Sequence, residues 1–213
     1  MAAQDTASDL VVLRFGRHRV PRPLADFPVR DIAGDAESAA SIDAAVRAAR
    51  RVIVVGTEAD LAAVLTRLLR TERLDVEVAP LRAGLWRRNA RRASSVAARR
   101  VPLIRDETGQ VIVGAAYWLP PGDAATVHGE GIVDDTVLFD GEAPGVRIEP
   151  TTAMPGLRAR LQTGRLRHGR WVSGRAAQLG TTGARVLRDG VGAPREVRRS
   201  TFYRHTEGWL RVR

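Results

Sequence analysis

The sequence contains no cysteine and no lysine, because all 34 residues counted as lysine plus arginine are arginine. Without cysteine the chain has no disulfides, no thiol nucleophile and none of the usual thiolate ligands of structural zinc. Without lysine it has no phosphate-loop lysine, no Schiff-base lysine and no lysine general base. The four histidines are isolated from any second ligand at metal spacing, so no metal site is expected.

Long apolar segments are also missing. The longest β-branched run, Val52–Val55, is far too short for a transmembrane helix. Residues 1–8 lack the basic start and apolar core of a signal peptide and are expected to form a flexible tail. These features predict a cytoplasmic protein. Peripheral association with a membrane and assembly into a homo-oligomer both stay open.

The formal net charge of +10 indicates an anionic partner, such as a nucleotide, a phospholipid surface or nucleic acid. Arginine is concentrated in residues 82–100 and 158–175, whereas residues 106–149 are rich in acids. Such alternation is typical of solvated faces and of ion pairs between segments. The charge pattern therefore indicates a class of partner and says nothing about the fold.

Residues 9–103 have the pattern of an α/β domain. The wholly apolar, β-branched run Val52–Val55 predicts a central strand that is covered on both faces. The following residues predict a helix with one apolar stripe, and residues 74–78 alternate as an exposed strand does. Together these elements predict a right-handed βαβ unit. A first strand at 10–15 and a helix at 38–51 are also expected. The apolar stripe consists of Leu61, Val64, Leu65 and Leu68.

Residues 104–213 have the pattern of an all-β domain, with short strand-like runs and glycine-containing turns about every ten residues. A hairpin is predicted around residues 106–109, and the last strand is expected to pack Trp209 and Leu210 in or near the core of this half. The predicted fold class is therefore an α/β N-terminal half, with a short parallel sheet and flanking helices, followed by an all-β C-terminal half.

The turn after the central strand reads Gly56-Thr57-Glu58-Ala59-Asp60 and leads into Leu61-Ala62-Ala63-Val64-Leu65. It resembles the signature of the diacylglycerol kinase-like lipid kinases, which share a superfamily with NAD kinases: Gly-Gly-Asp-Gly-Thr followed by Leu-Asn-Glu-Val-Val. Gly56 matches, Glu58 keeps a carboxylate, and two glycines and the threonine hydroxyl are lost. The resemblance implies the diacylglycerol kinase-like two-domain architecture. It also implies a phosphate or nucleotide site, with ATP and magnesium if the protein is active, at Gly56, Thr57, Glu58 and Asp60.

Two further family motifs have weak counterparts. In the nucleotide loop, which reads Gly-Thr-Gly-Asn-Asp in the family, only Asn89 corresponds, and the neighbouring Arg87 or Arg88 would neutralise phosphate charge. In the β domain, the family's Asp-Gly-Glu turn is similar to Asp189-Gly190-Val191, where valine replaces the glutamate that the resemblance implies as catalytic base. No residue of this chain is therefore assigned as catalytic.

Thr57 and Asp60 also have the spacing of a capping box, in which the two side chains take up N–H groups that a phosphate would need. Two interpretations stay open: a self-capped structural turn, and an anion or metal–nucleotide site in which a cation bridges carboxylate and phosphate. We expect a diacylglycerol kinase-like protein with a degenerate active site. It would be a ligand- or partner-binding pseudo-enzyme, with residual ATP-dependent lipid phosphorylation still open. The alternative is an arginine-rich protein that binds nucleic acid or an anionic membrane through residues 82–100 and 158–175.

Overall fold

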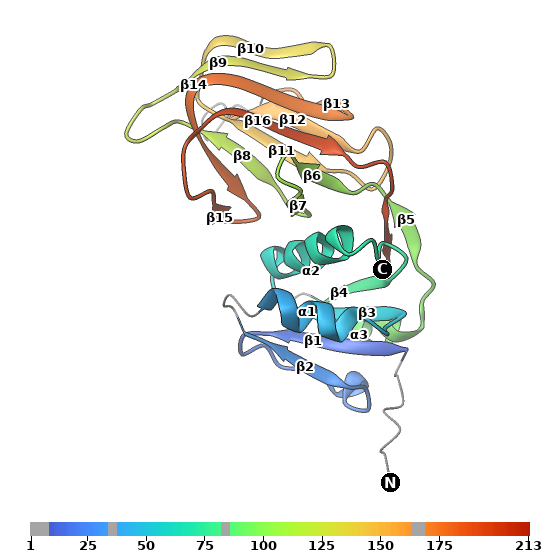
Figure 1. The fold of residues 1–213 in the computed structure, drawn as a ribbon. Coiled ribbons are helices and arrows are strands. Elements are labelled where there is room, and N and C mark those ends of the chain that lie inside the picture. Colours follow the sequence, from blue (N-terminus) through green and yellow to red (C-terminus); the bar gives the residue numbers. More distant parts are fainter. Residues whose placement is uncertain (1–8, 34–37, 82–85, 163–168) are drawn as a thin grey trace. The chain divides into compact units, whose positions relative to one another are not determined.

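The computed structural model describes residues 9–33, 38–81, 86–162 and 169–213. The predicted tail, residues 1–8, lies outside these ranges. The chain divides into two compact units (Figure 1). The first comprises residues 1–101 together with 208–213, and the second comprises residues 102–207.

The first unit is built on a sheet in the order β2-β1-β3-β4-β17-β5. The neighbours from β2 to β17 pair in parallel, and β5 runs antiparallel to β17 at the edge. Every residue of β3 is buried, as its apolar sequence predicts for a central strand. The strands are β1 Leu10–Phe15, β2 Val29–Ile32, β3 Arg51–Val55, β4 Glu77–Leu81, β5 Arg99–Val101 and β17 Trp209–Arg211.

Helices cover this sheet. Strand alternation sends Ile53 and Val55 to the face where they pack with Ala90 and Ala93 of α3, and sends Val52 and Val54 to the opposite face. Helices α1 and α2 pack against each other, α1 also against β1 and β2, and α2 against β3. The α2 stripe that the sequence predicts is buried as expected: Leu61, Val64, Leu65 and Leu68. The bounds are η1 Arg22–Leu24, α1 Ser38–Val46, α2 Glu58–Arg70 and α3 Trp86–Ser95.

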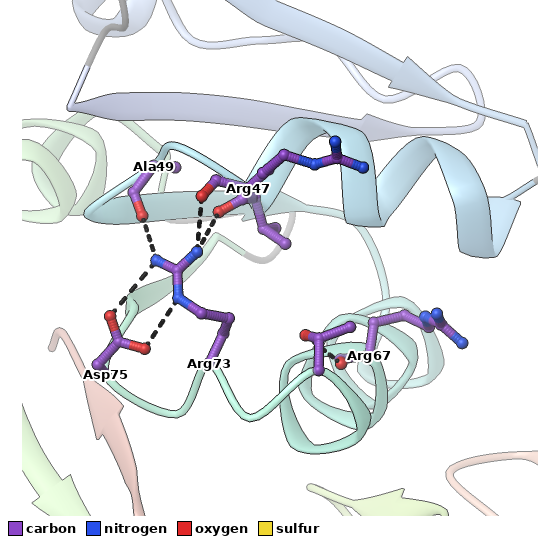
Figure 2. A network of polar contacts seen from close by, with 7 residues as sticks. Arg47, Ala49, Arg67, Arg73 and Asp75 are labelled. Atoms are coloured by element: carbon purple, nitrogen blue, oxygen red, sulfur yellow. Dashed lines mark hydrogen bonds and ion pairs between the residues drawn. The ribbon is translucent and has the colours of Figure 1, made fainter.

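Arg73 explains two differences from the predicted elements of this unit. Its guanidinium donates to the carbonyl oxygens of Val46, Arg47 and Ala49 at 3.2, 2.7 and 3.2 Å, so it caps the C-terminal end of α1 (Figure 2). Helix α1 therefore ends at Val46 rather than at residue 51.

The strand after Arg73 also begins later than the sequence predicts. The backbone N–H of Val76 donates to the Arg73 carbonyl at 3.1 Å, so residues 73–76 form a turn and β4 begins at Glu77 rather than at residue 74. Asp75 holds the Arg73 guanidinium from its other side, with Nε to Oδ1 at 3.0 Å (Figure 2). This hydrogen bond is the main reason that the pKa of Asp75 lies below its usual value.

The second unit is one antiparallel sheet curled around a core of its own. The long strand β14 pairs with β8 at one end and with β9 and β16 at the other. Trp118 and Phe202 lie in this core with ring centroids 6.2 Å apart, and the Trp118 Nε1–H donates to buried Ser200 Oγ at 3.0 Å. The predicted hairpin around residues 106–109 is present as β6 and β7.

The strands of the second unit follow the order β13-β12-β11-β8-β14-β16-β6-β7, with β9 on β14, β10 on β9 and β15 on β14. They are β6 Ile104–Asp106, β7 Val111–Ile112, β8 Ala116–Leu119, β9 Val127–Val133, β10 Thr136–Ala143, β11 Val146–Pro150, β12 Leu157–Leu161, β13 Val172–Gly174, β14 Ala176–Arg188, β15 Val191–Gly192 and β16 Val197–Arg204. The predicted fold class, an α/β half followed by an antiparallel β half, is confirmed.

The last strand corrects one expectation. β17 belongs to the sheet of the first unit, where Leu210 pairs with Glu77 in β4 and with Arg100 in β5. The N–H of Val212 then donates to the Val78 carbonyl at 2.9 Å. Trp209 is buried in this unit instead of in the β half, because the slot between β4 and β5 offers backbone partners on both sides.

Candidate functional site

The turn after β3 lies where a ligand site is expected in an open α/β sheet. From β1 the chain continues to β2 on one side and then returns through α1 to β3 on the other side, so the strand order reverses between β1 and β3. Ligands of such sheets bind outside the carboxyl ends of the strands at this switch point. Arg14 pairs with Val55 near the ends of the two strands, and Gly16 and Gly56 are the first residues after β1 and β3.

The turn itself is closed by its own side chains. Thr57 is the N-cap of α2 and has an extended backbone, with φ of −88° and ψ of 179°. The Thr57 backbone N–H donates to Asp60 Oδ2 at 2.7 Å, and the Thr57 hydroxyl donates to the same oxygen at 2.8 Å. The Asp60 N–H donates back to Thr57 Oγ1 at 3.3 Å. The capping box that the spacing predicts is therefore present.

Gly56 shows how little space the turn leaves. A Cβ atom placed on Gly56 would lie 2.5 Å from Asp60 Oδ2 and 3.0 Å from Asp60 Cβ. The carboxylate of Asp60 therefore folds back over the glycine at the start of the helix. Only a residue without a side chain fits beneath it.

The charge at this helix end is already balanced. The first turn of a helix carries partial positive charge, which attracts phosphate. In α2 the acidic residues of that turn are Glu58 and Asp60. A phosphate group would have to displace the Asp60 carboxylate from the Thr57 N–H, and it would meet two negative charges. The groups of this turn, as they are bonded here, do not fit an ATP–magnesium complex.

Helix α3 begins at the same edge of the sheet, because it follows the carboxyl end of β4. Arg87, Arg88 and Asn89 lie in its first turn. Asn89 is exposed, and the side chains of Arg87 and Arg88 lie outside the described part of the structure. The structure therefore brings this helix end to the same sheet edge as the Gly56 turn, without a described contact between them.

Buried Arg51 fixes the other end of α3. Its guanidinium donates to the carbonyl oxygens of Ala93 at 3.1 Å and Val96 at 2.9 Å. Its Nε donates to Glu77 Oε2 at 2.6 Å. The positive charge of buried Arg51 is therefore paired with a carboxylate on the neighbouring strand. Arg51 and Arg73 thus have the same role, since each binds the carbonyl end of a helix from a neighbouring segment.

The turn that resembles the family's β-domain motif has a structural use. Asp189 and Gly190 form the two-residue turn between β14 and β15, with φ angles of 47° and 87°. The Asp189 carboxylate accepts the backbone N–H groups of Val113, Gly114 and Ala115 at 2.9, 2.8 and 3.0 Å. Asp189 therefore ties the β14–β15 turn to the segment that precedes β8.

Some polar groups were not identified from the sequence. Asp106 is fully buried, and its Oδ2 lies 2.6 Å from Arg188 Nε. Its other oxygen accepts the N–H groups of Thr108 and Gln110 at 2.8 and 2.9 Å, which fixes the β6–β7 hairpin.

The run Leu157–Leu161 places arginines on one face of β12. Its alternation of arginine with apolar residues was the signal available in the sequence.

The fold that these units define is the diacylglycerol kinase-like and NAD kinase-like fold. A diacylglycerol kinase from Bacillus anthracis superposes with a TM-score of 0.70 at 11% identity, over 95% of this chain and 96% of that chain. An NAD kinase from Archaeoglobus fulgidus, crystallised in complex with ATP, superposes with a TM-score of 0.63 at 10% identity, over 96% of this chain and 93% of that chain. At these identities the likeness establishes the fold alone.

Sequence comparison adds nothing to this likeness, because no family model and no curated protein matches the chain.

Within the described residues, no helix is long and apolar enough to cross a membrane. The same described ranges contain no group of three or more histidine, aspartate or glutamate side chains that could hold a metal ion.

Proposed function

We propose that this chain is a ligand- or partner-binding pseudo-enzyme built on the diacylglycerol kinase-like fold. It keeps the architecture in which related folds place a nucleotide, and it does not transfer phosphate. The observation that carries the proposal is the Asp60 carboxylate, which accepts the Thr57 N–H at 2.7 Å in the turn where a phosphate would bind.

Two further features support the proposal. The resemblance implies a catalytic glutamate at the position of Val191, and valine can neither accept nor donate a proton. Asp189, the acid of the same turn, is engaged by the N–H groups of Val113, Gly114 and Ala115. A kinase reaction would need a base and a phosphate cradle. The position of the base holds valine, and the Thr57 N–H of the cradle is bound to Asp60.

The remaining enzymatic alternative is ATP-dependent phosphorylation of a lipid or small alcohol, with Glu58 and Asp60 holding magnesium and phosphate. The test is to incubate the full chain with radiolabelled ATP, magnesium and dispersed diacylglycerol, and to follow label in the lipid. We expect no transfer above a protein-free blank. Transfer that Glu58→Gln or Asp60→Asn abolishes, while Glu72→Gln leaves it unchanged, would overturn the proposal. Glu72 is an exposed acid after the far end of the same helix.

A further inference from the structure

The second unit carries a surface that combines arginine with aromatic rings. Five strands, in the order β13-β12-β11-β8-β14, present one face to the core and the other away from it. We call the second surface the arginine–aromatic face. Strand pairing places Tyr117 opposite Arg147, Arg147 opposite Arg160, and Glu149 opposite Arg158, so these side chains share one side of the sheet. The face consists of Tyr117, Arg147, Glu149, Arg158, Arg160 and Trp171.

The guanidinium groups of this face lie over its aromatic rings. Arg158 and Arg160 lie 4.2 and 4.4 Å from the ring centre of Trp171, and Arg147 lies 5.6 Å from that of Tyr117. A guanidinium that stacks by its flat face keeps its N–H groups at the edge for a second partner. Stacking also orders the side chain in advance, so less entropy is lost when a phosphate binds.

The charge of the face is positive. Glu149 pairs with Arg147 and with Arg158, each at 2.6 Å. Arg160 has no carboxylate partner among the described residues. Three arginines thus share this face with a single acid. Arg158 donates both Nε and Nη2 to Glu149, so Arg160 is the guanidinium that offers phosphate its bidentate geometry.

The face continues into a shallow pocket. Leu187 lies directly opposite Tyr117 on the neighbouring strand, and Arg185 lies opposite Leu119. These three residues, Leu119, Arg185 and Leu187, line an open cavity of about 260 Å³ together with Ala193 and Pro194. Its lining combines apolar residues with two arginines, Arg185 and Arg195, and one acid, Glu196. Its volume is just below the range of sites for drug-sized ligands. It suits a single flat ring better than a large ligand.

We propose that the arginine–aromatic face binds single-stranded nucleic acid, with phosphates on the stacked arginines and bases on the aromatic rings and in the pocket. Proteins that bind single strands combine a basic track with aromatic platforms, and a sheet face is a common support for both. A lipid surface fits less well, because membrane-surface binding requires protruding apolar side chains. The large apolar side chains that are most exposed in the described structure, Val137, Met154 and Val191, are not part of this face.

The first test is fluorescence anisotropy of a labelled oligonucleotide of about 20 nucleotides, which exceeds the site size of typical single-strand binding folds. The full chain should bind it, with an affinity that falls as salt rises. Arg147→Gln with Arg160→Gln should weaken binding at least about tenfold and should flatten the salt dependence, because fewer counterions are released. These changes leave the Arg158–Glu149 pair in place.

Arg198→Gln with Arg199→Gln is the matched control. Both residues are exposed on β16 of the same unit, outside the arginine–aromatic face, and the change in net charge is the same. The control should bind within about twofold of the unaltered protein. Equal losses in the two double variants would show a general attraction between polyanion and basic protein, and would overturn the proposal.

A second measurement uses the unaltered protein, so it does not depend on the folding of a variant. An oligonucleotide with photoreactive 5-iodouracil is cross-linked and the attached peptide is identified by mass spectrometry. Attachment at Tyr117 or Trp171 is expected. Attachment confined to α3, absence of binding at low salt, or binding only to vesicles that contain phosphatidylglycerol would each overturn the proposal.

Discussion

The carboxylate of Asp60 lies 2.7 Å from the backbone nitrogen of Thr57, at the start of the helix that follows the central strand. A side chain three residues along the chain thus occupies the place where an external anion would meet the helix. A phosphate at this helix end would have to compete with the Asp60 carboxylate for the Thr57 N–H.

The cap predicts a non-additive pair of substitutions. Asp60→Ala removes the acceptor of the Thr57 N–H and should lower the free energy of unfolding by about 1 kcal/mol. Gly56→Ala should be destabilising by a similar amount of about 1 kcal/mol, because the new Cβ would lie 2.5 Å from Asp60 Oδ2. Once Asp60 is alanine, the second change should cost clearly less, because the 2.5 Å contact with Oδ2 is gone and only the 3.0 Å contact with the Cβ of residue 60 remains. Urea unfolding of the four proteins measures this, and strictly additive losses would contradict the described contact.

Arg73 predicts a difference between arginine and lysine. Its guanidinium binds three carbonyl oxygens at the end of α1 and the Asp75 carboxylate at once. Arg73→Met should lower the free energy of unfolding by about 2 kcal/mol, and Arg73→Lys should recover less than half, because an ammonium lacks the planar fork. Arg70→Met, an exposed arginine in the last turn of α2, should change stability by about 0.5 kcal/mol or less. Full recovery by lysine would contradict the described geometry.

The Arg73–Asp75 pair also predicts a pH dependence. The hydrogen bond from Arg73 lowers the pKa of Asp75 in the folded protein. Its contribution is therefore present above the unfolded pKa of about 3.9 and is lost as the pH falls through the lower folded value. Because Asp75 is largely exposed, Asp75→Asn should destabilise by only about 0.5 kcal/mol at pH 7. The difference from the unaltered protein should vanish near pH 2 in urea unfolding. If the stability difference between Asp75→Asn and the unaltered protein grew as the pH fell, the pKa of Asp75 would be raised by folding, and the prediction would be contradicted.

Asp189 predicts a loss of stability rather than a loss of catalysis. Asp189→Ala leaves the N–H groups of Val113, Gly114 and Ala115 without their acceptor and places alanine at a φ of 47°. The combined effect should be about 2–4 kcal/mol. Asparagine tolerates this backbone conformation and keeps one acceptor oxygen. Asp189→Asn should therefore lower the free energy of unfolding by about half as much as Asp189→Ala. Thermal unfolding checks both, and an unchanged melting temperature for Asp189→Ala would contradict the structural role.

The sequence was sufficient for those features that depend on neighbouring residues. Val52–Val55 predicts its buried strand, the spacing from Leu61 to Leu68 predicts the α2 face, and Thr57 with Asp60 predicts the cap, because each pattern lies within a few residues. The local pattern predicts too late an end for α1, because the group that binds its last carbonyls is Arg73, which is distant in sequence.

Features that depend on remote partners could not be predicted. Trp209–Arg211 has the local pattern of a strand, and that pattern does not reveal which sheet offers an open slot. Similarly, nothing near Asp189 indicates that its carboxylate meets residues 113–115. The alternation of arginine with apolar residues in 157–161 was visible, but the arginine–aromatic face became apparent only when pairing placed Arg160 beside Arg147.

We propose that the Gly56–Asp60 turn, which is closed by its own carboxylate, does not accept phosphate. Nuclear magnetic resonance of the ¹⁵N-labelled chain tests it most directly, by following the backbone amides of Thr57 and Asp60 during titration with ATP and magnesium to millimolar concentration. We predict that these two resonances do not move in unaltered protein. A saturable shift of the Thr57 amide, absent in Asp60→Asn, would show a working nucleotide site and contradict the account.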